Sequence, residues 1–332
     1  MKIRTMRRMF FVLAFSLCLT GIMTGCGSKK QAGKIITEIK QLHSGDAKFY
    51  KDDIITSVGG HLAIYDKNGK LKKNFSDIDS NWIDCLEDEK IIVYGNGKKQ
   101  IGILQLDNHE NAKKNEIVME TENLQIDPTI LKVNGKYYMT ATEIIGTVNN
   151  ADKNAENGRY ILHLYQSEDL SHWSHVSDVV DEKHNIEDVD VAYLNDKFYI
   201  TYEQETVDKG DSSIHIAVSD DPDGKKFSNH QELIKANCDH EPATFVQLDS
   251  SKYRLYYSCD KNNRGESYQK SQAYYADFDK DWNVISQDNL VDTETKNGIL
   301  LYDVRAFDGK LQYLYARNYL TDCDLVVEEM KE

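Results

Sequence analysis

One strand–turn–strand unit recurs along this chain from about residue 46 to the end, and this repeat limits the folds open to the sequence. Each unit starts with a short apolar run, makes a tight turn and continues into a Tyr-rich run, as 126–138 and 188–199 both do. The turn residues Asn134-Gly135 and Asp308-Gly309 suit the positive φ angles of a two-residue hairpin. The clear units span about 80–118, 124–181, 186–235, 239–288 and 298–331, and a weaker unit spans 46–76.

Tandem units of this length predict an all-β fold, a β-propeller built from four-stranded blades. Radial packing buries both faces of each small sheet and leaves only short edges exposed. The last unit shows only three strands. The segment 46–76 either completes that unit, which gives the five blades we favour, or forms a sixth blade. An aromatic residue closes the second turn of three units, and we expect it to pack between neighbouring sheets: Trp173, Phe227 and Trp282.

The first 25 residues have the pattern of a signal peptide. A basic start is followed by an apolar run at 10–19, which is too short to span a bilayer. The sequence Met23-Thr24-Gly25-Cys26 resembles the bacterial lipoprotein box, in which Cys26 becomes lipidated; a plain secretory signal cleaved nearby is the alternative. We expect Cys26 and a flexible tether over 26–45, then one propeller domain over 46–332. The lipid would hold the protein on the outer face of the bacterial cell membrane.

Charge and composition exclude several classes of partner. Acidic residues outnumber basic ones by 55 to 40, so the formal net charge is −15. Because phosphate binding needs a basic surface, this balance argues against nucleic acid and against electrostatic docking on anionic lipid. Contact with a membrane is therefore expected only through the lipid anchor. The 20 Tyr residues favour strands. We expect a monomer.

The remaining cysteines show no Cys-x-x-Cys pair and no metal-ligand spacing: Cys85, Cys238, Cys259 and Cys323. We favour buried thiols for all four, and a disulfide between Cys238 and Cys259 stays open. The histidines also lack metal-ligand spacing. The sequence therefore predicts no cofactor and no metal; a structural calcium ion is left open, and nothing in the sequence indicates one.

Acidic residues stand at the start of the first strand in three consecutive units. Asp127 lies 10 residues before Tyr137, Asp190 lies 8 before Phe198, and Glu241 lies 12 before Tyr253. In a propeller the first strand of each blade lines the central funnel, so these positions converge at one mouth. Three carboxyl groups around one point suit glycoside hydrolysis, which needs one protonated and one ionised carboxyl across the scissile bond. A third carboxylate raises the pKa of the acid by repulsion.

This arrangement resembles the five-bladed glycoside hydrolases of family 43 and its relatives, the arabinanases, xylosidases and invertases. The resemblance covers about 124–290 and implies an inverting mechanism on pentose-containing oligo- or polysaccharides. Asp127-Pro128 looks like the motif of the general base, Asp190-Val191 like that of the carboxylate that tunes and orients the acid, and Glu241-Pro242 like that of the general acid. The turn at 167–173 is also typical of the family.

The second and third motifs depart from the family pattern. The second reads Asp188-Val189-Asp190, so Asp188 is a further candidate and takes the place of Asp190 if the strand register shifts by two residues. Arg305 and Trp82 are weaker candidates for substrate binding, through hydrogen bonds to the sugar and through ring stacking respectively. A salt bridge from Arg305 to Asp303 and blade packing by Trp82 are the alternatives.

The resemblance implies a surface-anchored glycoside hydrolase whose partner is a carbohydrate substrate. Because two motifs are altered, a non-catalytic propeller lipoprotein that binds glycan or protein is the alternative. A transferase or phosphorylase ranks last, since the funnel positions offer only Arg305 for phosphate.

Overall fold

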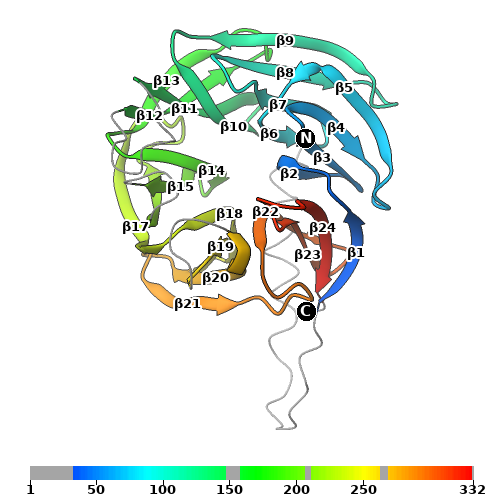
Figure 1. Cartoon of the computed structure of the whole chain (residues 1–332). Coiled ribbons are helices and arrows are strands. Elements are labelled where there is room, and N and C mark those ends of the chain that lie inside the picture. The colour runs from blue at the N-terminus through cyan, green and yellow to red at the C-terminus, as the bar shows by residue number, and fades with distance from the viewer. Residues whose placement is uncertain (1–32, 147–157, 206–210, 262–267, 331–332) are drawn as a thin grey trace.

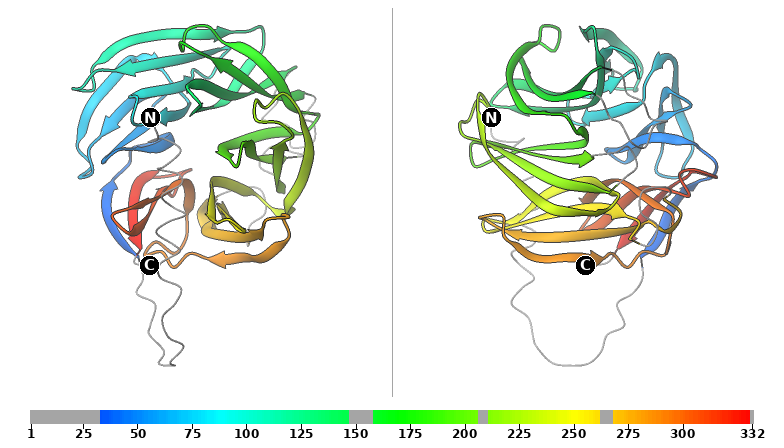
Figure 2. Two further views of the ribbon diagram at one scale, coloured as in Figure 1. Left: turned by 180° about the vertical axis from the view of Figure 1, so that it is seen from behind. Right: turned by 60° about the vertical axis from the view of Figure 1, so that its left-hand side comes forward.

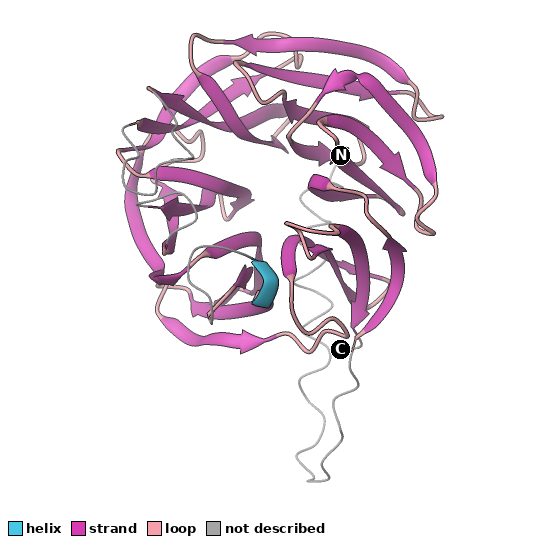
Figure 3. Cartoon of the chain, in the orientation of Figure 1, coloured by secondary structure: helices cyan, strands magenta, loops and turns pink. Residues whose placement is uncertain are grey.

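The computed structural model describes residues 33–146, 158–205, 211–261 and 268–330, and these form six four-stranded sheets arranged in a ring (Figure 1). Strands make up nearly all of the regular structure, and one short 3-10 helix, η1 (Tyr268–Lys270), is the exception within the described ranges (Figure 3). No helix in the described part of the chain has the length and apolar character needed to cross a bilayer.

Each of the first five blades consists of four consecutive strands, paired antiparallel in chain order. Blade 1 contains β2 (Ser44–Tyr50), β3 (Asp53–Val58), β4 (His61–Tyr65) and β5 (Leu71–Asp79). Blade 2 contains β6 (Trp82–Leu86), β7 (Ile91–Gly95), β8 (Gln100–Leu106) and β9 (Ala112–Glu120). Blade 3 contains β10 (Leu124–Val133), β11 (Lys136–Ile145), β12 (Arg159–Ser167) and β13 (Ser174–Glu182).

The same order continues through the second half of the ring. Blade 4 contains β14 (Asn185–Leu194), β15 (Lys197–Glu205), β16 (Ser212–Ser219) and β17 (Phe227–Cys238). Blade 5 contains β18 (His240–Asp249), β19 (Lys252–Cys259), β20 (Gln272–Asp279) and β21 (Val284–Leu290). Blade 6 contains β22 (Ile299–Phe307), β23 (Lys310–Arg317), β24 (Asp324–Met330) and, as its outer strand, β1 (Lys34–Ile39).

The strand β1 closes the ring and explains why the blade count differs from the expected five. It pairs antiparallel with β24, so the first and the last described strands share one sheet (Figure 1). The segment 46–76 is then free to form its own blade, and the propeller has six blades within the described residues. Residues 34–39, expected to belong to the tether, are therefore part of the propeller. The expected signal peptide and Cys26 lie outside the described residues.

Neighbouring blades are joined by six apolar clusters, one at each junction. The cluster between blades 4 and 5 shows the pattern, because Tyr199, Phe245, Tyr253 and Trp282 stack there. Trp173 and Phe227 pack against the clusters of their own junctions, which confirms the expected role of these turn aromatics. Burial of both faces of every sheet supplies the main stabilising free energy of this fold.

The first strand of every blade faces the axis, and each touches the first strand of the next: β2, β6, β10, β14, β18 and β22 (Figures 1 and 2). The predicted hairpin turn at Asn134-Gly135 is confirmed by φ angles of 50° and 87°, which match a turn with two left-handed residues. Because a tight turn ends each such first strand at a defined residue, it sets which residues of that strand lie at either end of the ring.

Candidate active site

Bulges at the start of two neighbouring first strands project Asp127 and Asp188 into the ring. The pairing of β10 with β11 is interrupted between Ile126 and Thr129, and that of β14 with β15 between Glu187 and Asp190. Inside these bulges Asp127 has φ 47° and Asp188 has φ 51°, a left-handed conformation that Asp tolerates better than most residues. Bulges of this kind redirect side chains next to active sites. Asp188 is therefore the counterpart of Asp127 in the next blade.

The carboxyl groups of Asp127, Asp188 and Glu241 meet at this end of the ring. The Asp188 backbone N–H donates to Asp127 Oδ2 at 2.8 Å, and the Asp188 carboxyl is hydrogen-bonded to Glu241. Asp188 thus touches both other residues, and the three come from the first strands of blades 3, 4 and 5. The convergence expected at one mouth is present, with Asp188 in the place assigned to Asp190.

Burial and like-charge repulsion favour the protonated forms of Asp127 and Asp188. Burial raises the pKa of Asp127 to about 7; the Asp188 N–H and Lys48 lower it, while Asp46 and Glu241 raise it. Burial also raises the pKa of Asp188 well above its usual range, and Glu241 and then Asp127 add to that shift by like-charge repulsion. A group of carboxyls in this setting carries both ionised and protonated members near neutral pH, as acid–base chemistry requires.

Asp190 has a different place from the one expected. Its Oδ2 accepts the backbone N–H of Phe245 in blade 5 at 2.9 Å, and its Oδ1 accepts the N–H of Val191. Asp84 and Asp303 form the same kind of link to the following blade, through Ile130 N–H and Phe49 N–H at 2.8 and 3.0 Å. Asp190 is therefore one of several side chains that join first strand to first strand around the ring.

A buried lysine, Lys48 on β2, lies among these linking aspartates. Its charge interacts with Asp46, Asp303, Asp84 and Asp190, and together they raise its pKa despite the opposing effect of burial. Its Nζ also donates to the carbonyl of Tyr302 at 3.3 Å. The ammonium group is therefore neutralised by several acids, which makes it a poor site for a phosphate group.

Trp82 lies at the same end of the ring as the three acids. Its ring packs against Gly95, where a Cβ would lie 3.2 Å from Trp82 Cε3 and 3.4 Å from Pro128 Cδ. Pro128 directly follows Asp127, so the indole borders the bulge of β10. Trp82 also packs on the apolar cluster between blades 3 and 4 while staying partly exposed. Trp82 therefore does pack between blades, as the alternative interpretation had it, and part of its indole remains exposed.

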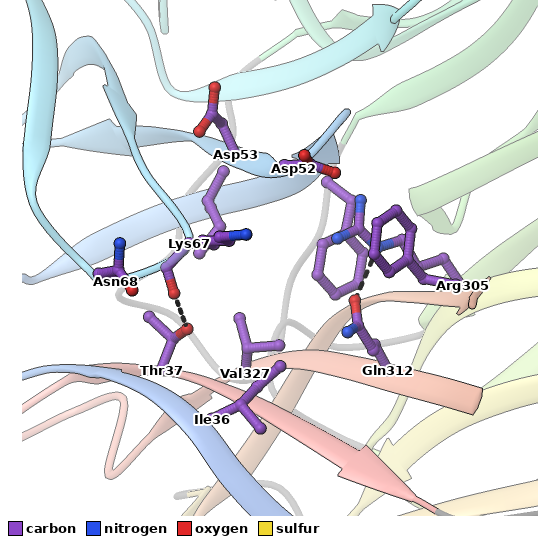
Figure 4. Close-up of a pocket in the computed structure, with 12 residues that line it drawn as sticks. Ile36, Thr37, Asp52, Asp53, Lys67, Asn68, Arg305, Gln312 and Val327 are labelled. Atoms are coloured by element: carbon purple, nitrogen blue, oxygen red, sulfur yellow. Dashed lines mark hydrogen bonds between the residues drawn. The ribbon is translucent and has the colours of Figure 1, made fainter. Parts of the chain in front are cut away.

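Arg305 lies at the opposite end of the first strands, away from the acids, contrary to the expectation. It stands near the end of β22 and lines a pocket of about 200 Å³ (Figure 4). Its guanidinium packs on the rings of Phe49 and Phe307, and donates to Gln312 Oε1 at 3.0 Å and to the carbonyl of Lys51. Because Lys51 follows the end of β2, Arg305 holds blades 1 and 6 together.

Two further residues lie at the site, and no clear pattern in the sequence predicts them. Tyr268, in η1, donates its hydroxyl to Glu241 Oε1 at 2.5 Å and so fixes that carboxyl. Glu203, on the second strand of blade 4, has an oxygen within 4.8 Å of oxygens of Asp188 and Glu241. Neither residue stands at the start of a first strand, and that position was the only criterion by which the sequence indicated site residues. Glu203 and Glu205, two residues apart on a mostly buried strand, are at most a weak indication.

A disulfide joins Cys238 and Cys259 beside the site. The favoured prediction of buried thiols is therefore wrong for this pair, and the alternative is confirmed. Cys85 and Cys323 are free thiols, and Cys323 is buried as expected. The disulfide ties the strand before His240 to the end of β19, so it braces the start of β18, where Glu241 stands.

Comparison with known proteins gives one family match and several similar structures. Residues 121–313 match the model of the glycosyl hydrolases family 43, and no curated protein sequence matches. The endo-arabinase of Bacteroides thetaiotaomicron VPI-5482 is similar with a TM-score of 0.51 and 12% identity, over 76% of this chain and 93% of that chain. A β-1,2-mannobiose phosphorylase from Listeria innocua has a TM-score of 0.48 and 12% identity over 92% of each chain. The native arabinanase of Bacillus subtilis has a TM-score of 0.48 and 12% identity, over 74% and 92%.

Proposed function

This chain belongs to the glycosyl hydrolases family 43, and on that premise we propose that Asp127, Asp188 and Glu241 carry an inverting hydrolysis of glycosidic bonds. As a member of the family the chain is a glycoside hydrolase with a carbohydrate substrate. The observation that carries the site assignment is the direct contact of Asp188 with both Asp127 and Glu241 at one mouth of the propeller.

Asp127 is the general base in this proposal. It removes a proton from a water molecule as that water attacks the anomeric carbon. Burial favours the neutral form of Asp127, while the Asp188 N–H and Lys48 favour the carboxylate, and the balance sets a pKa of about 7. A base with a pKa near 7 is ionised in about half of the molecules at neutral pH and still accepts a proton readily.

Glu241 is the general acid, and it protonates the glycosidic oxygen of the leaving group. The Tyr268 hydroxyl donates to its Oε1 and so fixes the position of the carboxyl. Asp188 orients Glu241 by hydrogen bonding. We assign this third role to Asp188 in place of Asp190, because Asp190 is engaged with the backbone of Phe245.

We further propose a pentose-containing oligo- or polysaccharide as substrate, action as a monomer, and anchoring on the outer face of the membrane through Cys26. The sugar class follows from the resemblance of the three motifs to those of arabinanases and xylosidases. One chain supplies all three acids, which suits a monomer. A disulfide in the described residues suits an oxidising compartment outside the cytoplasm. The partly exposed ring of Trp82 at the same mouth suits stacking on a sugar.

The test is hydrolysis of aryl-glycosides and of arabino- and xylo-oligosaccharides by the full chain, with product anomers followed by proton NMR. We expect turnover of a pentose substrate with inversion at the anomeric carbon. As a matched control, Glu328→Gln changes a fully buried carboxyl in blade 6 and should leave turnover intact. Saturable sugar binding without turnover on every substrate would instead support the non-catalytic alternative.

A further inference from the structure

Behind the catalytic acids lies a second group of carboxylates that the proposed reaction does not use. Glu203 and Glu205 come from β15, and Asp239 lies between β17 and β18. Their exposed fractions are 2%, 4% and 8%, so all three are buried. One oxygen from each lies within 4.8 Å of the other two. Carboxylates are rarely this buried unless they are paired, protonated or bound to a metal.

The surroundings of this group are negative. The charges that act most strongly on Glu203 and Glu205 all belong to other carboxylates, including Glu241 and Asp188. Glu203 Oε1 is buried and accepts no hydrogen bond. An unsatisfied buried carboxylate oxygen is costly, and in a native structure it calls for a ligand. The amide of Asn185, which donates to Glu205 at 3.1 Å, also has a buried Oδ1 without a partner.

We propose that Glu203, Glu205 and Asp239 form a binding site for one divalent cation of the calcium type. Two oxygens bound to one calcium ion at about 2.4 Å lie at most about 4.8 Å apart, so the observed spacing suits a shared ion. The donors are all oxygens, which favours calcium or magnesium over zinc. A buried cage of protein carboxylates favours calcium, because magnesium keeps several water ligands.

The site connects the cation to the catalytic acids without placing the ion among them. Glu203 belongs to both groups, since its oxygens also approach Asp188 and Glu241. A cation behind Glu203 offsets negative charge that otherwise crowds these acids. It also holds the end of β15 against the start of β18, where Glu241 stands.

Calcium binding by the full chain tests this inference. After removal of metal with EDTA, calcium is titrated in by calorimetry, and thermal unfolding is followed with calcium or with EDTA. We expect about one ion per chain, weaker binding of magnesium, and an unfolding temperature several degrees higher with calcium. Lack of binding to the wild-type chain at millimolar calcium would overturn the inference and leave these carboxyls protonated.

Matched variants locate the ion. Glu205→Gln and Asp239→Asn each keep the shape of the side chain and should weaken calcium binding at least tenfold. Glu328→Gln, at another buried carboxyl, should bind calcium as the wild type does. If a site variant fails to fold, hydrogen exchange on the wild-type chain decides, because calcium should protect β15 and the start of β18. Protection elsewhere, or unchanged binding in both folded site variants, would refute the site. These readouts do not depend on glycosidase activity, so they remain valid if the proposed reaction is wrong.

Discussion

Asp127 combines three constraints in one residue: a left-handed backbone, a buried carboxyl and acceptance of the Asp188 N–H. Such a conformation costs on the order of 1–3 kcal/mol and persists where the surrounding structure holds it. The pKa of about 7 adds a further cost at alkaline pH, because a buried carboxylate then has to ionise. The residue is therefore arranged for chemistry at the expense of stability.

The first prediction concerns pH and Asp127. Because the base must be ionised, kcat/KM should fall about tenfold per pH unit below about 7.

The stability of the fold should change with pH in the opposite direction to the activity. Between pH 4 and 7 the folded state keeps a proton that the unfolded state releases, so the free energy of unfolding falls as pH rises. Asp127→Asn removes that dependence and should be more stable than wild type at pH 8 but not at pH 3; the difference should be about 4 kcal/mol, which corresponds to the rise of the Asp127 pKa from its usual 3.8 to about 7. Urea unfolding at both pH values measures this; equal destabilisation at both would contradict it.

The second prediction separates Asp188 from Asp190. Asp188→Asn should lower kcat by roughly 10²-fold or more with little change in unfolding temperature, because it alters the carboxyl–carboxyl hydrogen bond that orients Glu241. Asp190→Ala should instead destabilise the fold by about 1–3 kcal/mol, since the Phe245 N–H loses its acceptor in a buried setting. Kinetics and thermal unfolding of both variants decide the matter. A larger loss of kcat in a folded Asp190→Asn variant than in Asp188→Asn would contradict this assignment and return the role of orienting Glu241 to Asp190.

At the residue scale, sequence reasoning reached the carboxylates through one rule, that acids at the starts of first strands converge. The rule located Asp127 and Glu241 and left Asp188 open. It missed the two-residue shift because the bulge in β14 changes the register, and a bulge has no reliable sequence signature. The expected position of Arg305 was wrong for a related reason, since its place in the sequence of β22 does not show at which end of the ring its side chain lies.

At the scale of strands, β1 is the element that turns six sheets into a closed ring. Its pairing with β24 covers an edge that would otherwise be exposed. Arg317 bridges the two strands through Glu38 and Asp324, and Thr37 donates to the Lys67 carbonyl of blade 1. Pairing of β1 with β24 therefore links blade 6 to blade 1 as well as completing the sheet of blade 6.

Removal of β1 is the third prediction. A chain that starts at 41 should unfold at least about 5 °C lower than the full chain and form aggregates, because the β24 edge becomes available for intermolecular pairing. A chain that starts at 33 keeps β1 and is the matched control. Thermal unfolding and size-exclusion chromatography compare the two. Equal stability of both shortened chains would mean that β1 does not close the ring.

Reduction of the disulfide between Cys238 and Cys259 is the fourth prediction. The bond closes a short loop across blades 4 and 5, and such loops contribute about 3 kcal/mol. A reducing agent should therefore lower the unfolding temperature of the wild-type chain. The double variant with Cys238→Ser and Cys259→Ser should unfold at a lower temperature than the wild type, and the reducing agent should not change that temperature. A wild-type chain that is indifferent to reductant would show that the bond does not form in solution.

For the whole molecule, the repeat in the sequence was enough to predict the propeller and the limits of its blades within a few residues. It could not fix the number of blades. That number depends on whether 34–39 is tether or strand, and a six-residue segment is too short to decide by pattern. Long-range closure is a property of the folded ring. The same holds for Glu203 and Tyr268, which reach the site through tertiary packing.

The most direct test of the account is the dependence of each variant on the leaving group. A substrate with a dinitrophenyl leaving group needs no protonation, whereas a pentose oligosaccharide does. If Glu241 is the acid and Asp127 the base, Glu241→Gln should lose about 10²–10⁴-fold in kcat/KM on the oligosaccharide and far less on the dinitrophenyl glycoside. Asp127→Asn should lose heavily on both. Retention of wild-type activity on the oligosaccharide by a folded Glu241→Gln variant would contradict the assignment of this centre.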